Sequence, residues 1–81
     1  MHKYYPLKYK DIAKVLKRMW CNEAYNMHWS HIMWYNPKND IFFDVVNHQA
    51  KEILTKTIEL MLKSAWINRS EFYEYISNKK K

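Results

Sequence analysis

The segment from residue 31 to residue 46 constrains the fold most, because two strand-like runs lie on either side of one short turn. The first run, His31–Tyr35, is aromatic and apolar, and successive residues of the second run, Ile41–Val46, alternate between two faces. Asn36-Pro37-Lys38-Asn39 suits a type I turn, with Pro at its second position and an Asn that tolerates a left-handed corner. Asp44 marks one face of the second run as at least partly exposed. The pattern predicts an antiparallel β-hairpin.

Helical periodicity flanks this hairpin on both sides. The first helix should run from about Tyr9 to Trp20 and the second from about Ala50 to Ser64. In both segments apolar residues recur at the spacing of one buried helix face. They are Ile12, Val15, Leu16 and Met19 in the first segment and Leu54, Ile58, Met61 and Ala65 in the second. The pairs Glu52–Lys56 and Glu59–Lys63 have opposite charges four residues apart, which favours the second helix.

Two further signals complete the predicted order of elements. Residues 21–28 could form a short strand, and Asn68-Arg69-Ser70-Glu71 resembles a capping box that opens a short terminal helix. A sheet of three antiparallel strands needs one face covered, and the two main helices can cover it. We therefore expect an α+β fold, a two-layer α-β-β-β-α sandwich with both main helices on one face of the sheet and a short C-terminal helix. Residues 1–78 would form a single domain, and Lys79–Lys81 a basic, frayed tail.

The second face of this sheet would remain uncovered. It would display Tyr25, Met33, Tyr35 and Phe42, and an open sheet face with aromatic side chains is a candidate binding surface. The chain also contains no glycine. Left-handed backbone positions should therefore fall to Asn and Asp, which tolerate them best after glycine.

The net charge of +6 and a pI near 9.5 favour nucleic acid as a partner and, second, an acidic protein. Cations near the N-terminus could form either a solvated helix face or one wall of a phosphate-binding track. They are Lys8, Lys10, Lys14, Lys17 and Arg18. No stretch approaches the roughly 20 apolar residues of a membrane span, and the N-terminus lacks the apolar run of a signal peptide. The single Cys21, a buried hydrophobe or a reactive thiol, fits a reducing cytoplasm.

Histidine supplies most of the candidate chemistry, although the alternative for each is a structural or solvent-facing residue. If both lay on one strand, His28 and His31 would point to opposite faces, and no second cysteine supports a zinc site, so we expect neither a metal nor a cofactor. Ser30 and His31 do not form a nucleophilic dyad, because neighbours on a strand diverge and no acid is evidently placed to orient the pair. RNA cleavage needs less, because the 2′-hydroxyl is the nucleophile, and one imidazole with nearby cations suffices for modest catalysis.

Several short motifs, taken in order, resemble the HicA family of toxin–antitoxin RNases over most of the chain. Trp29-Ser30-His31-Ile32 is similar to the Gly-Ser-His motif of that family, whose histidine is catalytic. Four other segments resemble the first helix, a Pro-x-His strand end, the second helix, and an Ala-Gly-Ile and acidic-Phe ending. They are Lys10–Leu16, Val45–His48, Lys51–Ile58 and Ala65–Phe72.

This resemblance implies a double-stranded-RNA-binding-like fold and a metal-independent endoribonuclease toxin of a type II toxin–antitoxin system. It assigns cleavage of mRNA to His31 as the single catalytic histidine and implies neutralisation by a HicB-like antitoxin protein. Ser30 would hydrogen-bond phosphate or set the local backbone. The candidate RNA contacts are Ser30, Lys14, Lys17, Arg18, His48, Lys51 and Lys56.

The chain departs from the family pattern at two positions beside these motifs. Trp29 stands where the family has glycine, and Asn47 stands where it commonly has proline. The indole of Trp29 could block the approach of RNA or stack on a base. An alternative hypothesis is therefore a catalytically inactive protein on the same scaffold, which binds structured RNA or inhibits a nuclease or another protein partner.

Overall fold

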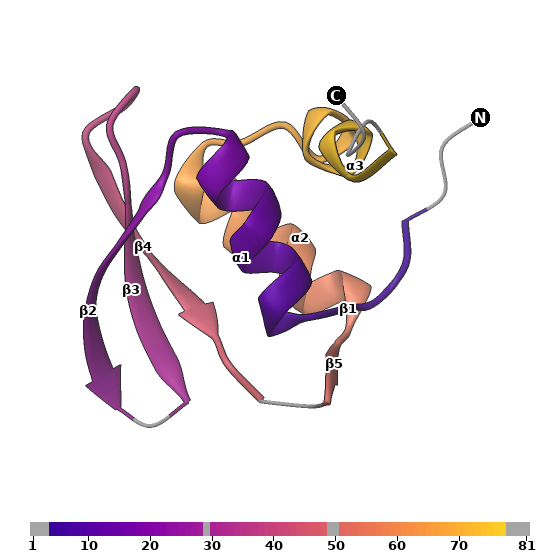
Figure 1. Cartoon of the computed structure of the whole chain (residues 1–81), viewed down its shortest axis with the longest axis horizontal. Coiled ribbons are helices and arrows are strands. Elements are labelled where there is room, and N and C mark those ends of the chain that lie inside the picture. The colour runs from indigo at the N-terminus through magenta and orange to yellow at the C-terminus, as the bar shows by residue number, and fades with distance from the viewer. Residues whose placement is uncertain (1–3, 29, 49–50, 78–81) are drawn as a thin grey trace.

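The computed structural model describes residues 4–28, 30–48 and 51–77. Its elements in chain order are β1 (Leu7–Lys8), α1 (Tyr9–Arg18), β2 (Asn22–His28), β3 (His31–Asn36), β4 (Ile41–Val46), β5 (Glu52–Ile53), α2 (Thr55–Ala65) and α3 (Arg69–Ser77). Figure 1 shows β2, β3 and β4 as one layer, with the helices on one side of it. Trp29 and the predicted tail Lys79–Lys81 lie outside the described residues.

The three longer strands form an antiparallel sheet with β3 in the centre. β3 pairs with β4 along the whole length of both strands without a register shift, which confirms the predicted hairpin. In the turn, the backbone N–H of Asn39 donates to the carbonyl oxygen of Asn36 at 3.3 Å. Asp40 takes the left-handed corner with φ 56°. The predicted strand within residues 21–28 is also confirmed, as β2.

Alternation along the strands separates a buried sheet face from an open one. Trp34, Phe43 and Val45 are buried beneath the helices, whereas Tyr25 and Phe42 are 56% and 55% exposed. The helices contribute further fully buried side chains to the same core, among them Ile12, Leu16, Ile58, Leu62 and Phe72. Burial of each large apolar side chain contributes about 1.5–3 kcal/mol, so this shared core holds the layers together. The predicted two-layer α+β sandwich is confirmed.

The prediction for the second helix is wrong over its first turn. α2 begins at Thr55 rather than Ala50, which itself lies outside the described residues. Glu52–Ile53 instead forms β5, which pairs antiparallel with β1. This pairing buries Ile53 to 3% exposure, while Leu54 at the start of α2 is 66% exposed and does not belong to the buried helix face.

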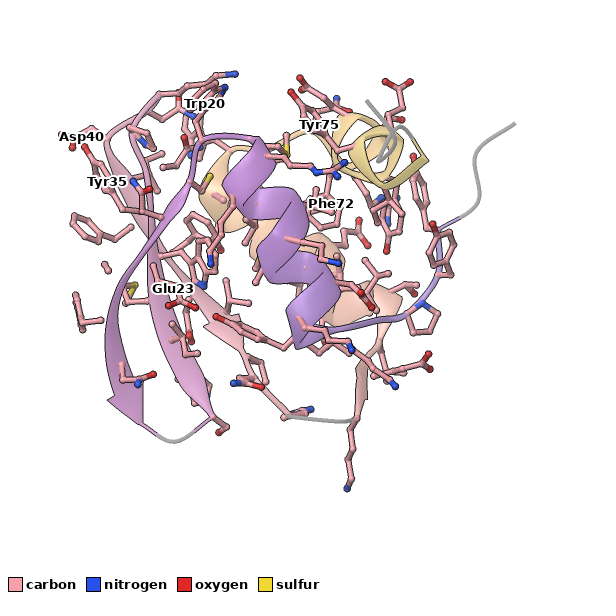
Figure 2. The ribbon with its side chains drawn as sticks, in the orientation of Figure 1. Trp20, Glu23, Tyr35, Asp40, Phe72 and Tyr75 are labelled. Atoms are coloured by element: carbon pink, nitrogen blue, oxygen red, sulfur yellow. The ribbon has the colours of Figure 1, made fainter. Side chains whose placement is uncertain are left out.

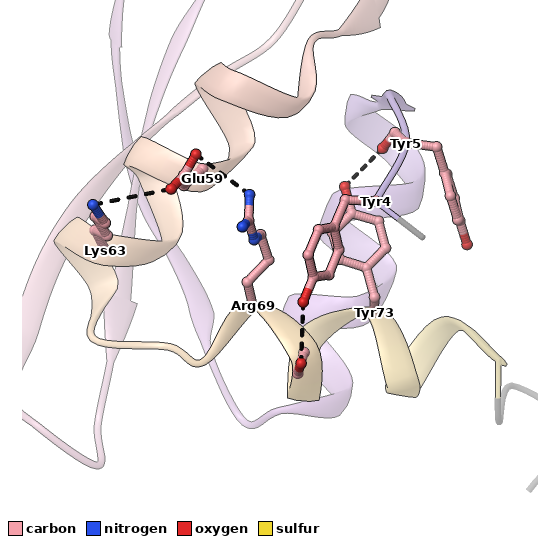
Figure 3. A network of polar contacts seen from close by, with 7 residues as sticks. Tyr4, Tyr5, Glu59, Lys63, Arg69 and Tyr73 are labelled. Atoms are coloured by element: carbon pink, nitrogen blue, oxygen red, sulfur yellow. Dashed lines mark hydrogen bonds and ion pairs between the residues drawn. The ribbon is translucent and has the colours of Figure 1, made fainter. Parts of the chain in front are cut away.

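Of the two charged pairs predicted for the second helix, one is wrong and one is confirmed. Glu52 lies in β5 and Lys56 in α2, so they do not form a pair within one helix. The predicted pair within α2 is confirmed, because Lys63 Nζ lies 4.0 Å from a carboxylate oxygen of Glu59. The second oxygen of Glu59 lies 3.3 Å from Arg69 of α3, which joins the two helices (Figure 3).

α1 and α2 both end in a Schellman motif with tryptophan at its left-handed position. After α1, the N–H of Trp20 donates to Lys17 at 3.1 Å and that of Cys21 to Leu16 at 2.9 Å. After α2, equivalent bonds run from Trp66 and the residue that follows it. The φ angles of Trp20 and Trp66 are 73° and 62°. The expectation that Asn and Asp would fill such positions is therefore wrong at both helix ends and right at Asp40.

An aromatic cluster fastens the N-terminal segment to α3, as Figure 3 shows. The hydroxyl of Tyr73 donates to the carbonyl oxygen of Tyr5 at 2.7 Å, and the Tyr4 hydroxyl lies 3.1 Å from Ser70 Oγ. The guanidinium of Arg69 lies 4.0 Å from the centre of the Tyr4 ring, a cation–π contact. The Asn68 side chain accepts from the N–H of Glu71 at 3.0 Å, as the predicted cap of α3 requires.

Candidate functional site on the open face of the sheet

The candidate site lies where β3 begins and β4 ends. His31 is the first residue of β3 and pairs with Val46, and Met33 pairs with Asp44. Diagonal neighbours on one face of an antiparallel pair lie within reach of each other's side chains. His31 Nδ1 lies 2.9 Å from Asp44 Oδ2. The two side chains are 41% and 43% exposed, so the pair is open to solvent on the uncovered face.

This pairing defines what the imidazole can do. When Nδ1 carries the proton, the Nδ1–H donates a hydrogen bond to the carboxylate of Asp44, and Nε2 keeps its lone pair. A histidine held in this way can accept a proton at Nε2, and the carboxylate stabilises the imidazolium that results. The arrangement supplies a general base that becomes a general acid, at a solvent-exposed position.

Sequence reasoning missed Asp44 as a partner of His31. It identified Asp44 as the exposed residue of its strand and found no acid placed to orient the histidine. The position of the turn in the sequence was nevertheless enough to predict this pairing. A hairpin that closes at Asn36 and Ile41 places Asp44 opposite Met33, and therefore diagonal to His31.

Other predicted site residues gather at the same end of the sheet. The carbonyl oxygen of Ser30 accepts a hydrogen bond from the N–H of Asn47 at 2.8 Å, which extends the pairing of β3 and β4 by one step. His48 follows directly and is exposed. Its carbonyl oxygen accepts from the N–H of Lys51 at 3.1 Å, and the Lys51 side chain is exposed. The structure thus brings Ser30, His48 and Lys51 to the end of the sheet that carries His31.

The predicted cations of α1 lie elsewhere. The residues that follow α1, Met19 and Cys21, line a small pocket with Lys38 at the tip of the hairpin. Figure 2 shows Trp20 and Asp40 at the same end of the molecule, near the hairpin tip. The hairpin tip and His31 are separated by the length of β3, about 17 Å at 3.3 Å per residue.

The cations expected near His31 are therefore not supplied by the end of α1, where Lys17 and Arg18 lie. Lys14 and Arg18 line a groove between α1 and α3, in the helical layer. Lys56 is exposed on α2. RNA contacts by Lys14, Lys17, Arg18 and Lys56 remain predictions, and they would need an RNA that extends around the molecule.

Aromatic side chains extend the open face from His31 toward the hairpin tip. The rings of Tyr35 and Phe42 lie 4.8 Å apart and tilted at 46°. The Tyr35 hydroxyl donates to Asp40 Oδ1 at 2.6 Å, and Figure 2 shows both residues on the side of the sheet away from the helices. This hydrogen bond raises the pKa of the Tyr35 phenol above its ordinary value. Exposed rings of this kind can stack on nucleic-acid bases.

The structure favours Cys21 as a buried hydrophobic residue over a reactive thiol. Cys21 is 2% exposed, and burial raises the pKa of its thiol, which disfavours the reactive thiolate. Among residues 4–28, 30–48 and 51–77, no three His, Cys, Asp or Glu side chains are placed to hold a metal ion. Within the same ranges no helix combines the length and apolarity needed to cross a bilayer.

Neither family models, curated proteins nor solved structures give a match to this chain. The functional assignment consequently depends on the geometry of the His31–Asp44 pair and on the motifs in the sequence.

Proposed function

We propose that the protein is a metal-independent endoribonuclease in which His31 transfers protons, similar to the mRNA-cleaving toxins of the HicA family. The single observation that carries this proposal is the pairing of His31 Nδ1 with Asp44 Oδ2 at 2.9 Å on a solvent-exposed sheet face. Oriented and exposed, this histidine meets the geometric requirement for acid–base catalysis on a large substrate. Its place directly after Ser30 agrees with the Ser-His part of the family motif.

The reaction requires no nucleophile from the protein. His31 Nε2 removes the proton of a ribose 2′-hydroxyl, and the 2′-oxygen attacks the adjacent phosphorus atom. A bond forms between the 2′-oxygen and phosphorus, the bond from phosphorus to the 5′-oxygen breaks, and the imidazolium returns its proton to the leaving 5′-oxygen. The products are a 2′,3′-cyclic phosphate and a 5′-hydroxyl. Asp44 keeps the ring in orientation throughout and stabilises the imidazolium that forms between the two proton transfers.

The surroundings of His31 supply binding groups for the substrate. Tyr35 and Phe42 offer rings for base stacking on the same face. Lys51 and His48 lie at the same end of the sheet and can contact phosphate groups. RNA would then pass along the open face, from the hairpin tip toward the start of β3.

Cleavage of a single-stranded RNA in the presence of EDTA tests the proposal. We expect the unmodified protein to cut the RNA and His31→Ala to lose at least about 10²-fold in rate, the usual contribution of an acid–base group. Lys63→Ala, a change of an exposed side chain on α2, is the control that should leave the rate unchanged. Equal rates for His31→Ala and the unmodified protein would contradict the proposed role, and loss of cleavage in EDTA would point to a metal enzyme instead.

A second candidate function follows from the exposure of the open face. Tyr25 and Phe42 are each more than half exposed on the sheet face away from the helices, and such surfaces are typical of binding sites. On this hypothesis the protein binds structured RNA or a protein partner without cutting RNA. Binding without cleavage, at an affinity that His31→Ala does not change, would favour this function over the nuclease.

The resemblance also supports proposals on partner and location. A HicB-like antitoxin would neutralise the protein in the cytoplasm, and it should be acidic where it meets a chain of net charge +6. Co-purification of the protein with the product of an adjacent gene tests this proposal. Recovery of the protein free of that product, from cells that express both genes, would contradict it.

A further inference from the structure

A groove of about 470 Å³ runs between α1 and α3, in the helical layer. Its lining combines buried apolar side chains with charged ones. The residues are Leu7, Asp11, Lys14, Val15, Arg18, Tyr75 and Ile76. Leu7 and Val15 are 7% and 4% exposed, so the floor of the groove is continuous with the core.

Basic side chains dominate the α1 side of this groove. Asp11 is the one acidic residue of α1, which carries Lys10, Lys14, Lys17 and Arg18 on its outer surface. Arg18 Nη1 donates to the carbonyl oxygen of Tyr75 in α3 at 3.4 Å, so its guanidinium lies across one end of the groove. An apolar floor with a basic rim calls for a ligand that is apolar on one side and acidic on the other.

We propose that this groove docks an acidic amphipathic helix of a partner protein. Two neighbouring helices present a surface into which the side-chain ridge of a third helix packs, with apolar anchors on one face. Acidic residues flanking those anchors would meet Lys14 and Arg18. Nucleic acid fits this groove less well, because the apolar floor formed by Leu7, Val15 and Ile76 gives phosphate groups no hydrogen-bond donors, and the donors lie only at the rim.

The docking site is separate from the proposed catalytic pair. His31 and Asp44 lie on the open face of the sheet, whereas the groove lies among the helices that cover the other face. A helix in the groove therefore leaves His31 uncovered. The inference stands without the proposed RNase activity, and its test measures binding alone.

Titration of the ¹⁵N-labelled full chain with a synthetic amphipathic peptide, Leu on one face and Glu on the other, tests the proposal by NMR. We expect the largest shift changes at Lys14, Val15, Tyr75 and Ile76, and at least about tenfold weaker binding by Lys14→Glu combined with Arg18→Glu. Lys56→Glu, an equal change of charge per site on α2, should weaken binding far less.

Three outcomes would overturn the proposal. A peptide of the same composition in scrambled order, which cannot form one apolar face, would bind as tightly. Lys56→Glu would weaken binding as much as Lys14→Glu combined with Arg18→Glu does. Single-stranded RNA would shift the groove resonances while the peptide leaves them unchanged, which would make the groove a nucleic-acid site. The spectrum of each free variant should match that of the unmodified protein outside the substituted site, which shows that a loss of binding does not come from unfolding.

A different observation carries a second inference, at the two helix ends. Trp20 and Trp66 hold the left-handed position of two Schellman motifs and are 73% and 74% exposed. Glycine is the usual residue at this position, because a side chain there is unfavourable. This chain contains no glycine. We infer that both positions are encoded by UGA and are read as glycine in the cell that makes the protein. UGA codes for tryptophan in some genetic codes and for glycine in others, so one codon assignment accounts for both positions.

The gene sequence and the mass of the natively expressed protein test this second inference. We expect UGA codons at positions 20 and 66, and proteolytic peptides whose masses correspond to glycine at each. UGG codons, or peptides with the mass of tryptophan, would overturn it. Trp34, which is buried and donates from Nε1 to the Tyr9 hydroxyl at 3.1 Å, is the internal comparison, because its indole fills the core.

Discussion

At the scale of single residues, two exposed tryptophans occupy left-handed backbone positions that glycine usually fills. Trp66 has φ 62° and ψ 40°, a conformation that places the Cβ atom of a non-glycine residue too close to the backbone. Its side chain is 74% exposed and therefore contributes little packing in return. The same description fits Trp20. Both positions are local weak points that a smaller residue would relieve.

Trp66→Gly should accordingly stabilise the protein by about 1 kcal/mol, because glycine adopts the left-handed conformation without steric cost. Leu60→Gly is the matched control. Leu60 is 56% exposed within α2, where glycine costs about 1 kcal/mol. Urea unfolding followed by circular dichroism measures both free energies. A destabilised Trp66→Gly variant would show that the indole makes contacts that outweigh its backbone strain.

Asp44 is the residue through which His31 is positioned. Asp44→Asn keeps the size of the side chain but removes the charge that would stabilise an imidazolium, so we expect kcat for the proposed RNA cleavage to fall by about tenfold or more with KM little changed. Asp44→Glu should recover part of the lost rate, because it restores the carboxylate. Unchanged kcat in Asp44→Asn would show that the contact is structural.

At the scale of elements, β5 shows how a distant strand changes local structure. Residues 51–54 continue the helical pattern of α2, yet Glu52–Ile53 pairs with Leu7–Lys8. The pairing gives two short segments backbone hydrogen bonds and buries Ile53 in the common core. One further turn of helix would forgo both gains, because Ile53 would lose its place against Leu7.

Ile53→Ala should therefore destabilise the protein by about 2–5 kcal/mol, the cost of truncating a buried aliphatic side chain. Leu54→Ala, one position further along, should change stability by less than about 0.5 kcal/mol, because Leu54 is 66% exposed. Chemical denaturation of the two variants gives the comparison. The reverse order of effects would indicate that the predicted helix, with Leu54 on its buried face, is correct.

At the scale of the whole molecule, tyrosine hydroxyls connect separate parts of the fold. The Tyr9 hydroxyl of α1 donates to Glu23 of β2 at 2.8 Å and accepts from Trp34 Nε1 at 3.1 Å. Burial, and then the hydrogen bond to Glu23, raises the pKa of Tyr9 well above its ordinary value. Burial likewise raises the pKa of Tyr73, which fastens α3 to the N-terminal segment.

These shifts predict a loss of stability in alkali. A group whose pKa is raised by folding stabilises the folded state fully below its unfolded pKa, here about 10, and loses that contribution as the pH rises further. The free energy of unfolding should fall above about pH 10, and Tyr9→Phe should show a shallower fall. Tyr25→Phe on the open face is the control. Identical slopes for Tyr9→Phe and the unmodified protein would contradict this account.

Local patterns were enough to predict the elements whose signals lie within a few residues. The stripe of Ile12, Leu16 and their neighbours predicted α1, alternation with a Pro-containing turn predicted β3 and β4, and Asn68 marked the start of α3. The two-layer arrangement followed, because three strands and two amphipathic helices have few ways to bury their apolar faces. None of these predictions required a contact between residues distant in the chain.

Contacts between distant residues decided the remainder. The pairing of Ile53 with Leu7 replaced the first predicted turn of α2, so that this helix starts only at Thr55. The register of the hairpin joined His31 to Asp44, and the direction of α1 carried Arg18 toward the hairpin tip. The free energy of such a contact depends on both partners and on the geometry between them. A periodicity in one segment reports which of its faces is buried, and the residue that lies against this face is fixed only when the chain has folded.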